Sequence, residues 1–245
     1  MDNSKLETGL KKLGYNPTGE QLALFDRYYE MLVEKNKVMN LTAITEYDEV
    51  VLKHFVDSAS IIRAAENDDE LSKAVRCGKI LDLGTGAGFP GIPLKILFPD
   101  MEIVLMDSLN KRLVFLDEVI RELGLRGVTT CHARAEEIAR KPEHRECYDL
   151  VVSRAVARLS VLSEFCMGFV KVGGYFTPYK AGGSEDEITA GLKAVETFGG
   201  KLVRISEFEL PDSDIKRAIP VIKKVKHTPD KYPRVGKKAE KNPIE

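Results

Sequence analysis

From Lys79 onward, short apolar runs alternate with amphipathic stretches, and this alternation restricts the possible folds more than any other feature of the chain. Each apolar run has the length of a strand, and apolar residues recur at helical spacing in most of the stretches between them. Strands that alternate with helices form parallel sheets covered on both faces. The expected strands are residues 80–83, 103–106, 128–131, 150–153, 175–178, 202–210 and 219–226. The sequence therefore predicts an α/β fold with a mostly parallel, seven-stranded sheet.

Helices are expected between the first five strands and before the sixth. Their predicted positions are residues 91–97, 111–123, 135–140, 159–170 and 185–198. The last two strands have no helix between them, so we expect them to form an antiparallel pair.

The N-terminal part of the chain carries helix signals. Its first apolar stripe, at helical spacing, consists of Leu6, Leu10 and Leu13. Thr18 and Gln21 have the spacing of a capping box, in which each side chain bonds the other's backbone N–H. A further helix is expected after Thr45, its candidate cap, and the charged residues 66–70 are expected to lead into the next part.

This pattern predicts two parts. Residues 1–75 form an N-terminal helical segment, and residues 76–245 form the α/β core with a basic C-terminal tail.

A glycine-rich turn follows the first strand, with the sequence ILDLGTGAGFPG at residues 80–91. Glycines allow positive φ angles and let a ligand approach the backbone, and the following helix presents unpaired N–H groups. One interpretation is the dinucleotide fingerprint G-x-G-x-x-G, but its first glycine would lie three residues beyond the strand. The other places Asp82 in the strand end, with Gly84, Gly86 and Gly88 after it. This second frame resembles motif I of the S-adenosylmethionine-dependent methyltransferases, and we favour it.

Two carboxylates accompany the glycines. Asp82 is a candidate for holding the ammonium group of the cofactor, directly or through water. Asp107 ends the next strand, where a carboxylate can accept both ribose hydroxyls of an adenosine. A second interpretation is that Asp107 caps the helix that follows, a role for which Ser108 competes.

The fourth expected strand ends in Ser153 and Arg154, at the edge where the methyl group of the cofactor would lie. The Asn/Asp-Pro-Pro-aromatic motif typical of enzymes that methylate exocyclic base amines is missing here. Methylation at cytosine C5 needs a nucleophilic cysteine, and neither Cys147 nor Cys166 lies in a Pro-Cys context. Guanine N7 has a free lone pair and requires no general base, so its methylation is compatible with this strand end.

Charge is distributed unevenly along the chain. The 37 basic and 38 acidic residues give a net charge of −1, which by itself argues against a nucleic-acid partner. Residues 216–245, however, contain ten basic and three acidic residues, against 27 and 35 in residues 1–215. A body of −8 with a tail of +7 is typical of a chain that has a charged partner.

Composition excludes several other classes. No uncharged apolar run approaches the about 18 residues of a membrane span, and no apolar signal-peptide core follows Met1. The four cysteines and four histidines show neither C-x-x-C spacing nor a ligand cluster, so no metal site is predicted. These features indicate a cytoplasmic protein with reduced thiols and no membrane partner.

Several motifs together resemble the bacterial small-subunit ribosomal RNA methyltransferase G family, also called glucose-inhibited division protein B. They are NKVMNLTAI at residues 36–44, HFVDS at 54–58, the glycine turn and its helix at 82–95, DSLNKR at 107–112, SRAVA at 153–157 and KYPR at 231–234. The resemblance implies a Rossmann-like class I methyltransferase that transfers methyl from S-adenosylmethionine to N7 of one guanine in the decoding-region loop of 16S rRNA. S-adenosylhomocysteine would be the product.

The resemblance also implies site residues. Family cofactor positions correspond to Gly84, Phe89, Ala135, Glu136 and Arg154, and we assign Arg154 the catalytic role. Asp82, Gly86, Gly88 and Asp107 are added from the motif argument above.

Basic residues near the expected site or in the tail are the RNA-binding candidates: Lys111, Arg112, Lys180, Lys231, Arg234 and Lys237. The predicted partner is 16S rRNA or the small ribosomal subunit, bound by a monomer. Two alternatives remain open at this point: a non-catalytic ribosome-assembly factor with a vestigial cofactor pocket, and a nicotinamide-dependent oxidoreductase. The roles of His54 and Asp57, which share one helix face, are also open.

Overall fold

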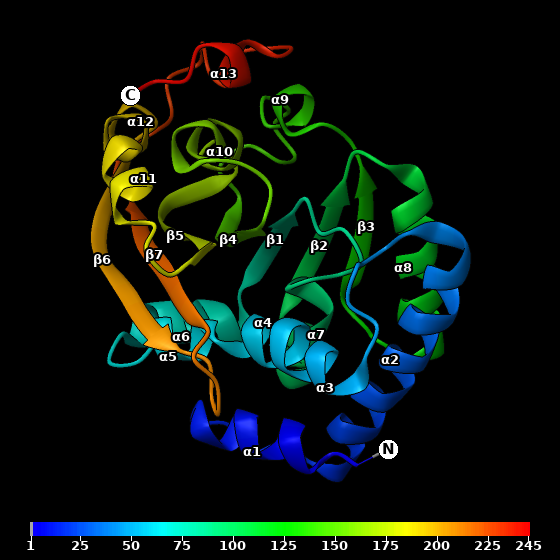
Figure 1. The fold of residues 1–245 in the computed structure, drawn as a ribbon. Helices are drawn as coiled ribbons and strands as arrows, with labels where there is room; N and C mark the ends of the chain where they lie inside the picture. The colour runs from blue at the N-terminus through cyan, green and yellow to red at the C-terminus, as the bar shows by residue number, and fades with distance from the viewer. Residues whose placement is uncertain (1) are drawn as a thin grey trace.

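The computed structural model describes residues 2–245, and its centre is a seven-stranded sheet in the order β3-β2-β1-β4-β5-β7-β6 (Figure 1). Its strands are β1 (Lys79–Leu83), β2 (Glu102–Asp107), β3 (Val128–His132), β4 (Tyr148–Arg154), β5 (Val170–Ala181), β6 (Gly200–Glu209) and β7 (Lys216–Lys224). Strands β1 to β5 are parallel, and β7 runs antiparallel to both β5 and β6. The predicted fold, including the antiparallel pair of last strands, is confirmed.

One face of the sheet is covered by the N-terminal helices and the helices after β1 and β2. These are α1 (Ser4–Lys12), α2 (Gly19–Met39), α3 (Tyr47–Val50), the π-helix η1 (Val51–Val56), α4 (Asp57–Ala59), α5 (Ile61–Ala64), α6 (Asp69–Cys77), α7 (Gly91–Leu97) and α8 (Asn110–Glu122). Their buried side chains form one hydrophobic cluster with inward-facing residues of the sheet. The N-terminal helical segment thereby lies directly against the elements that carry the glycine turn.

The second face is covered by helices from the later part of the chain. They are α9 (Ala135–Ile138), α10 (Leu159–Cys166), α11 (Glu185–Ala190) and α12 (Leu192–Thr197), followed by α13 (Lys238–Lys241) near the C-terminus. The predicted helix over 185–198 is divided at Gly191, where a Cβ would come within 2.8 Å of Leu159. A glycine at this point therefore lets the backbone approach α10 closely.

The residues that cap the N-terminal helices agree with the sequence prediction in one case and differ from it in two. Thr18 and Gln21 make both hydrogen bonds of the predicted capping box at the start of α2. The next helix is capped by Glu46 instead of Thr45, because the Glu46 carboxylate accepts from the Glu49 N–H at 3.0 Å. Residues 66–70 are more than a link, since Asp68 caps α6 by accepting from the Leu71 N–H. Among the described residues, no helix is both long and apolar enough to cross a membrane.

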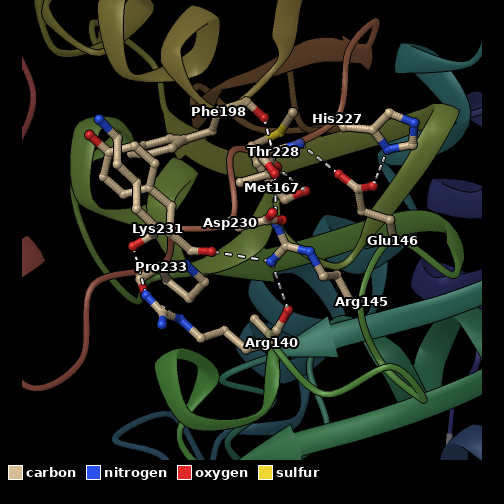
Figure 2. A network of polar contacts seen from close by, with 12 residues as sticks. Arg140, Arg145, Glu146, Met167, Phe198, His227, Thr228, Asp230, Lys231 and Pro233 are labelled. Atoms are coloured by element: carbon tan, nitrogen blue, oxygen red, sulfur yellow. Dashed lines mark hydrogen bonds and ion pairs between the residues drawn. The ribbon is translucent and has the colours of Figure 1, made fainter.

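After β7, the chain returns over the second face, and the segment that includes α13 passes above α10 and α12 (Figure 1). Two arginines bind its backbone, as Figure 2 shows. Arg140 donates to the carbonyls of Lys231 and Pro233 at 2.6 and 2.8 Å, and Arg145 donates to the Thr228 carbonyl at 2.6 Å. These are charge-assisted hydrogen bonds, and they fix the path of the segment.

Two cations of this C-terminal part are themselves buried or paired. The Lys224 ammonium donates to the Thr228 hydroxyl and lies 3.0 Å from the Glu146 carboxylate, and burial lowers the pKa of Lys224 to about 8. Arg234 binds Glu164 through two guanidinium nitrogens, with Nε–Oε1 at 2.9 Å and Nη2–Oε2 at 2.6 Å. The Glu164 side chain is only 1% exposed. Arg234, predicted to bind RNA, therefore neutralises a buried carboxylate in this structure.

Arg234→Ala should strongly destabilise the protein, because it leaves the Glu164 carboxylate buried without its counter-ion. The expected loss is about 3–5 kcal/mol in the free energy of unfolding, measured by chemical denaturation. Lys237→Ala, at an exposed position nearby, should change the same quantity by less than about 0.5 kcal/mol. Equal effects of the two substitutions would contradict the structural role of Arg234.

Candidate functional site

The glycine turn contains three glycines with positive φ, 73° at Gly84, 61° at Gly86 and 105° at Gly88. Their surroundings differ. A Cβ on Gly88 would meet the Tyr28 hydroxyl and Ile92 at 2.7 Å, and a Cβ on Gly84 would meet Val156 at 2.5 Å. A Cβ on Gly86 would meet nothing nearer than the Gly84 carbonyl oxygen at 4.0 Å. Gly88 therefore serves internal packing, whereas Gly86 exposes its backbone to open space that a ligand can enter.

Helix α2 supports this turn from behind. The buried Tyr28 hydroxyl donates to the Ala87 carbonyl at 2.5 Å. The ring of Tyr28 lies 5.5 Å from that of Phe89, which is 5% exposed. The sequence did not reveal this role of Tyr28, because the carbonyl that it binds lies 59 positions further along the chain.

Asp82 holds the turn in shape from within. Its side chain is fully buried, and Oδ2 accepts from the Thr85 hydroxyl at 2.6 Å and the Gly91 N–H at 2.9 Å. Burial raises the pKa of Asp82 to about 6. Oδ1 has no hydrogen-bond donor among the described residues, so one acceptor is left for a group such as the cofactor's ammonium or a bridging water. The sequence predicts that Asp82 holds the ammonium either directly or through water. Direct contact would require this buried side chain to become accessible to the ligand.

Asp107 lies at the end of β2 and binds the same turn. Its Oδ2 accepts from the Gly86 N–H at 3.0 Å and from Arg112 at 3.1 Å, and its Oδ1 accepts from the Leu109 N–H at 2.9 Å. A carboxylate offers about four acceptor positions, so one on Oδ1 stays free for a ribose hydroxyl. Arg112, predicted to bind RNA, is engaged by Asp107 beside the turn.

Ala135 and Glu136 begin α9 after β3, as predicted, and both are largely buried. The Glu136 carboxylate lies 3.8 Å from Arg134. These residues, the glycine turn and Asp107 share the carboxyl edge of β1 to β3, and this acidic edge fits a cofactor that bears ammonium and sulfonium charges.

Arg154 ends β4 and connects several elements. Its Nη1 donates to Asp57 Oδ2 at 2.9 Å and to the Lys53 carbonyl at 3.1 Å, and its guanidinium lies 5.1 Å from the ring centroid of Phe89. The His54 ring stacks on Phe89 at 4.5 Å between centroids. Arg154 therefore stands between η1 and the glycine turn, in contact with both.

Asp57 is shared by two arginines. Its Oδ1 accepts from Arg217 Nε at 2.7 Å, while Oδ2 accepts from Arg154, and Asp57 itself is 2% exposed. The helical spacing of His54 and Asp57 indicated a common face, and the structure places that face on Arg154. Arg217 lies in β7, and no local sequence pattern pointed to it.

His54 is neutral at this site. Burial and the adjacent charge of Arg154 lower the pKa of His54 to about 4. Arg154 Nη2 lies 3.2 Å from Nδ1, and Thr42 Oγ1 lies 2.9 Å from Nε2. The Lys53 carbonyl also lies 3.0 Å from Nδ1, so both ring nitrogens have hydrogen-bond partners. His54 lies in the π-helical turn η1, a local geometry frequent at functional sites.

A cavity of about 650 Å³ opens beside Arg154, between the ends of β4 and β5, the start of β7 and α11. His54, Asp57 and Arg217 line one part, and Lys180 and Glu187 line another. Lys180, a predicted RNA-binding residue, donates to Glu187 Oε1 at 2.7 Å and to the Ala157 carbonyl at 2.8 Å. Its charge is therefore neutralised inside the cavity.

The remaining RNA candidates are exposed. Lys111 lies in the first turn of α8, Lys231 in the returning C-terminal segment and Lys237 before α13. None of the three forms an ion pair within residues 2–245. The same part of the chain contains no His, Cys, Asp and Glu grouping suited to a metal ion.

The chain resembles known proteins along nearly its whole length. The profile of one family, described as rRNA small subunit methyltransferase G, matches residues 21–216. A protein of that name from Lachnoclostridium phytofermentans is 51% identical over 244 residues, covering 99% of this chain and 98% of the relative. One from Bacillus subtilis is 45% identical over 245 residues and covers 100% of both chains.

Among solved structures, TrmN from Thermus thermophilus is similar with a TM-score of 0.50 at 17% identity, covering 71% of this chain and 53% of that chain. Identity this low shows a shared fold alone. Together with the observed strand order, it agrees with the predicted Rossmann-like class I methyltransferase fold.

Gly86→Ala should weaken ligand binding, at a cost in stability that the matched control reproduces. The new methyl group stands in open space where a ligand would approach, and the positive φ alone costs about 1–2 kcal/mol. Calorimetric titration with S-adenosylhomocysteine should therefore show reduced affinity. Gly124→Ala is the matched control, since Gly124 has φ 63° and no neighbour within 4 Å of its Cβ position. Affinities that fall equally, or not at all, would contradict the assignment.

His54→Gln should flatten the pH dependence of stability between pH 6.5 and pH 4. The unfolded chain protonates His54 below about 6.5, whereas the folded protein does so only near pH 4. The free energy of unfolding of the wild-type protein therefore falls as the pH drops through this window. The contribution of His54 to this fall is about 3 kcal/mol. The measurement is the difference in unfolding free energy between the two proteins across the window; a constant difference would refute the neutral, buried state of His54.

Proposed function

The chain belongs to the family of rRNA small subunit methyltransferase G, and we propose that it transfers a methyl group from S-adenosylmethionine to N7 of one guanine in the decoding-region loop of 16S rRNA. Membership in a methyltransferase family confirms the predicted cofactor and leaves no support for the nicotinamide alternative. The atom and the RNA site are our proposal, in keeping with the names of the relatives.

The observation that carries the N7 proposal is the engagement of His54 and Asp57, the two titratable side chains that contact Arg154. The Asp57 carboxylate is bound by two arginines, and both ring nitrogens of His54 have hydrogen-bond partners. Lys180 is paired with Glu187. Neither His54 nor Asp57 is free to remove a proton from an attacking amine. Guanine N7 attacks through a lone pair that it already has, so it needs no such base.

S-adenosylmethionine supplies an electrophilic methyl group when bound. The residues proposed to hold it are Asp82, Gly84, Gly86, Gly88, Phe89, Asp107, Ala135 and Glu136. The carboxylates accept from its ammonium and ribose hydroxyls, and the exposed backbone at Gly86 allows close approach. Gly84 and Gly88 contribute indirectly, by permitting the turn and its packing.

Arg154 is proposed to align the target nucleotide at the edge of the cofactor site. Its guanidinium is fixed by Asp57, the Lys53 carbonyl and His54, so alignment requires no ordering at the moment of reaction. Lys111, Lys231 and Lys237 are proposed to bind rRNA phosphates. A cytoplasmic, monomeric enzyme acting on the small ribosomal subunit stays a prediction.

Methylation should be tested with purified protein, methyl-labelled S-adenosylmethionine and small subunits from cells that lack this activity. We expect label in 7-methylguanosine at a single position of 16S rRNA. Arg154→Ala should reduce transfer at least 100-fold, about 2.7 kcal/mol of transition-state stabilisation or more. Arg126→Ala, exposed before the start of β3 and so at the opposite end of that strand from the site, should leave the rate unchanged.

Near-UV circular dichroism of each variant would verify that it is folded. Label on another atom or RNA would overturn the specificity proposed here. Complete lack of transfer by a protein that still binds the subunit would favour the assembly-factor alternative.

A further inference from the structure

We propose that Glu187 selects guanine in the cavity beside Arg154, by accepting hydrogen bonds from the N1–H and the 2-amino group of the base. This inference rests on the proposed N7 methylation and assigns the specificity of the same site. Glu187 lies in α11, and no sequence motif had marked it as functional.

The cavity has two chemically different ends. At one end, Arg154 and His54 both contact Phe89 of the glycine turn. At the other end, Lys180 and Glu187 line the wall. The volume of about 650 Å³ is ample for a nucleotide. A purine placed between these ends presents one edge to Arg154 and His54, the residues that contact Phe89, and the opposite edge to Glu187.

The Glu187 carboxylate is fixed through one oxygen and open at the other. Oε1 accepts from Lys180 Nζ at 2.7 Å and from the Leu159 N–H at 2.8 Å. Oε2 accepts no hydrogen bond from any residue in the range 2–245. Its two lone pairs suit two adjacent donors, and Lys180 with Leu159 holds the carboxylate in place before a base arrives.

Guanine matches this arrangement in a way that adenine does not. Its N1–H and 2-amino group are neighbouring donors on one edge, while N7 lies on the far side of the ring system. A guanine bound to Glu187 therefore keeps the N7 lone pair free and directs it toward the end of the cavity formed by Arg154 and His54. Adenine would place the lone pair of N1 against the carboxylate, which is repulsive.

The charge balance of the reaction favours a carboxylate here. The N7 lone pair forms a bond to the methyl carbon as the bond from that carbon to sulfur breaks. The positive charge moves from the sulfonium to the purine, sulfur leaves as a neutral thioether, and no proton is transferred. A fixed carboxylate on the opposite edge is attracted more strongly to the purine as its charge develops, so it stabilises the transition state over the ground state.

The test compares guanosine and inosine at the target position, in small subunits reconstituted with ligated 16S rRNA. Inosine keeps N7 and N1–H but lacks the 2-amino group. The wild-type protein should methylate guanosine about 10-fold faster in kcat/KM, since a hydrogen bond to a charged group is lost with inosine. Glu187→Gln should lower the rate on guanosine about 10- to 100-fold and bring the guanosine-to-inosine ratio close to one.

Asp186→Asn, exposed on the same helix, is the matched control and should keep the wild-type ratio. A purely structural Glu187 would lower both rates together and leave the ratio intact, which would overturn the proposal. A wild-type protein that methylates N7 of both bases equally would also overturn it, without affecting the proposed function. Methylation at a different atom would instead remove the proposed function itself.

Discussion

The buried carboxylate of Asp57, shared by Arg154 and Arg217, is the interaction on which the site depends. It joins three parts of the chain that are far apart in sequence: the N-terminal helices, the end of β4 and the start of β7. Removing one partner from a buried ion pair leaves an uncompensated charge, at a cost of about 3–5 kcal/mol. The site therefore forms only when the N-terminal helices pack on the sheet, and Phe89 and His54 are set in place by the same contact.

The basic residues of the C-terminal part do not form one separate positive segment, because several of them are ion-paired with acidic residues elsewhere in the chain. The +7 tail contains Arg217, Lys223, Lys224 and Arg234, all of which are ion-paired with acidic residues of the body. Part of the basic excess thus offsets buried or edge carboxylates and holds the C-terminal segment to the second face. The cations left for RNA are fewer and more scattered than the composition suggested, with Lys111 on a different element from Lys231 and Lys237.

Much of the fold was predictable because its signals are local. Strand positions, the glycine turn and the capping box at Thr18 each depend on residues within a few positions of one another. The division of the predicted helix at Gly191 could not be predicted in this way, because it depends on close packing against Leu159, 32 positions earlier. The helix caps at Glu46 and Asp68 were missed although their contacts are local. The limit set by distant contacts also applies to the site. Asp82, Asp107 and Arg154 lie at strand ends and could be found, whereas Tyr28 contacts Ala87 across 59 residues and Arg217 contacts Asp57 across 160. Glu187 could not be singled out, because it is one of three acidic residues in the first turn of α11, a pattern typical of solvent-exposed helix starts.

The contact between Arg234 and Glu164 also bears on the order in which the fold can form. Glu164 lies on α10, and its counter-ion follows 70 residues later, after β5, β6 and β7. Burying this carboxylate before Arg234 is in place would leave an uncompensated charge, at a cost of about 3–5 kcal/mol. The second face of the sheet therefore closes over α10 together with the C-terminal segment, and not before it.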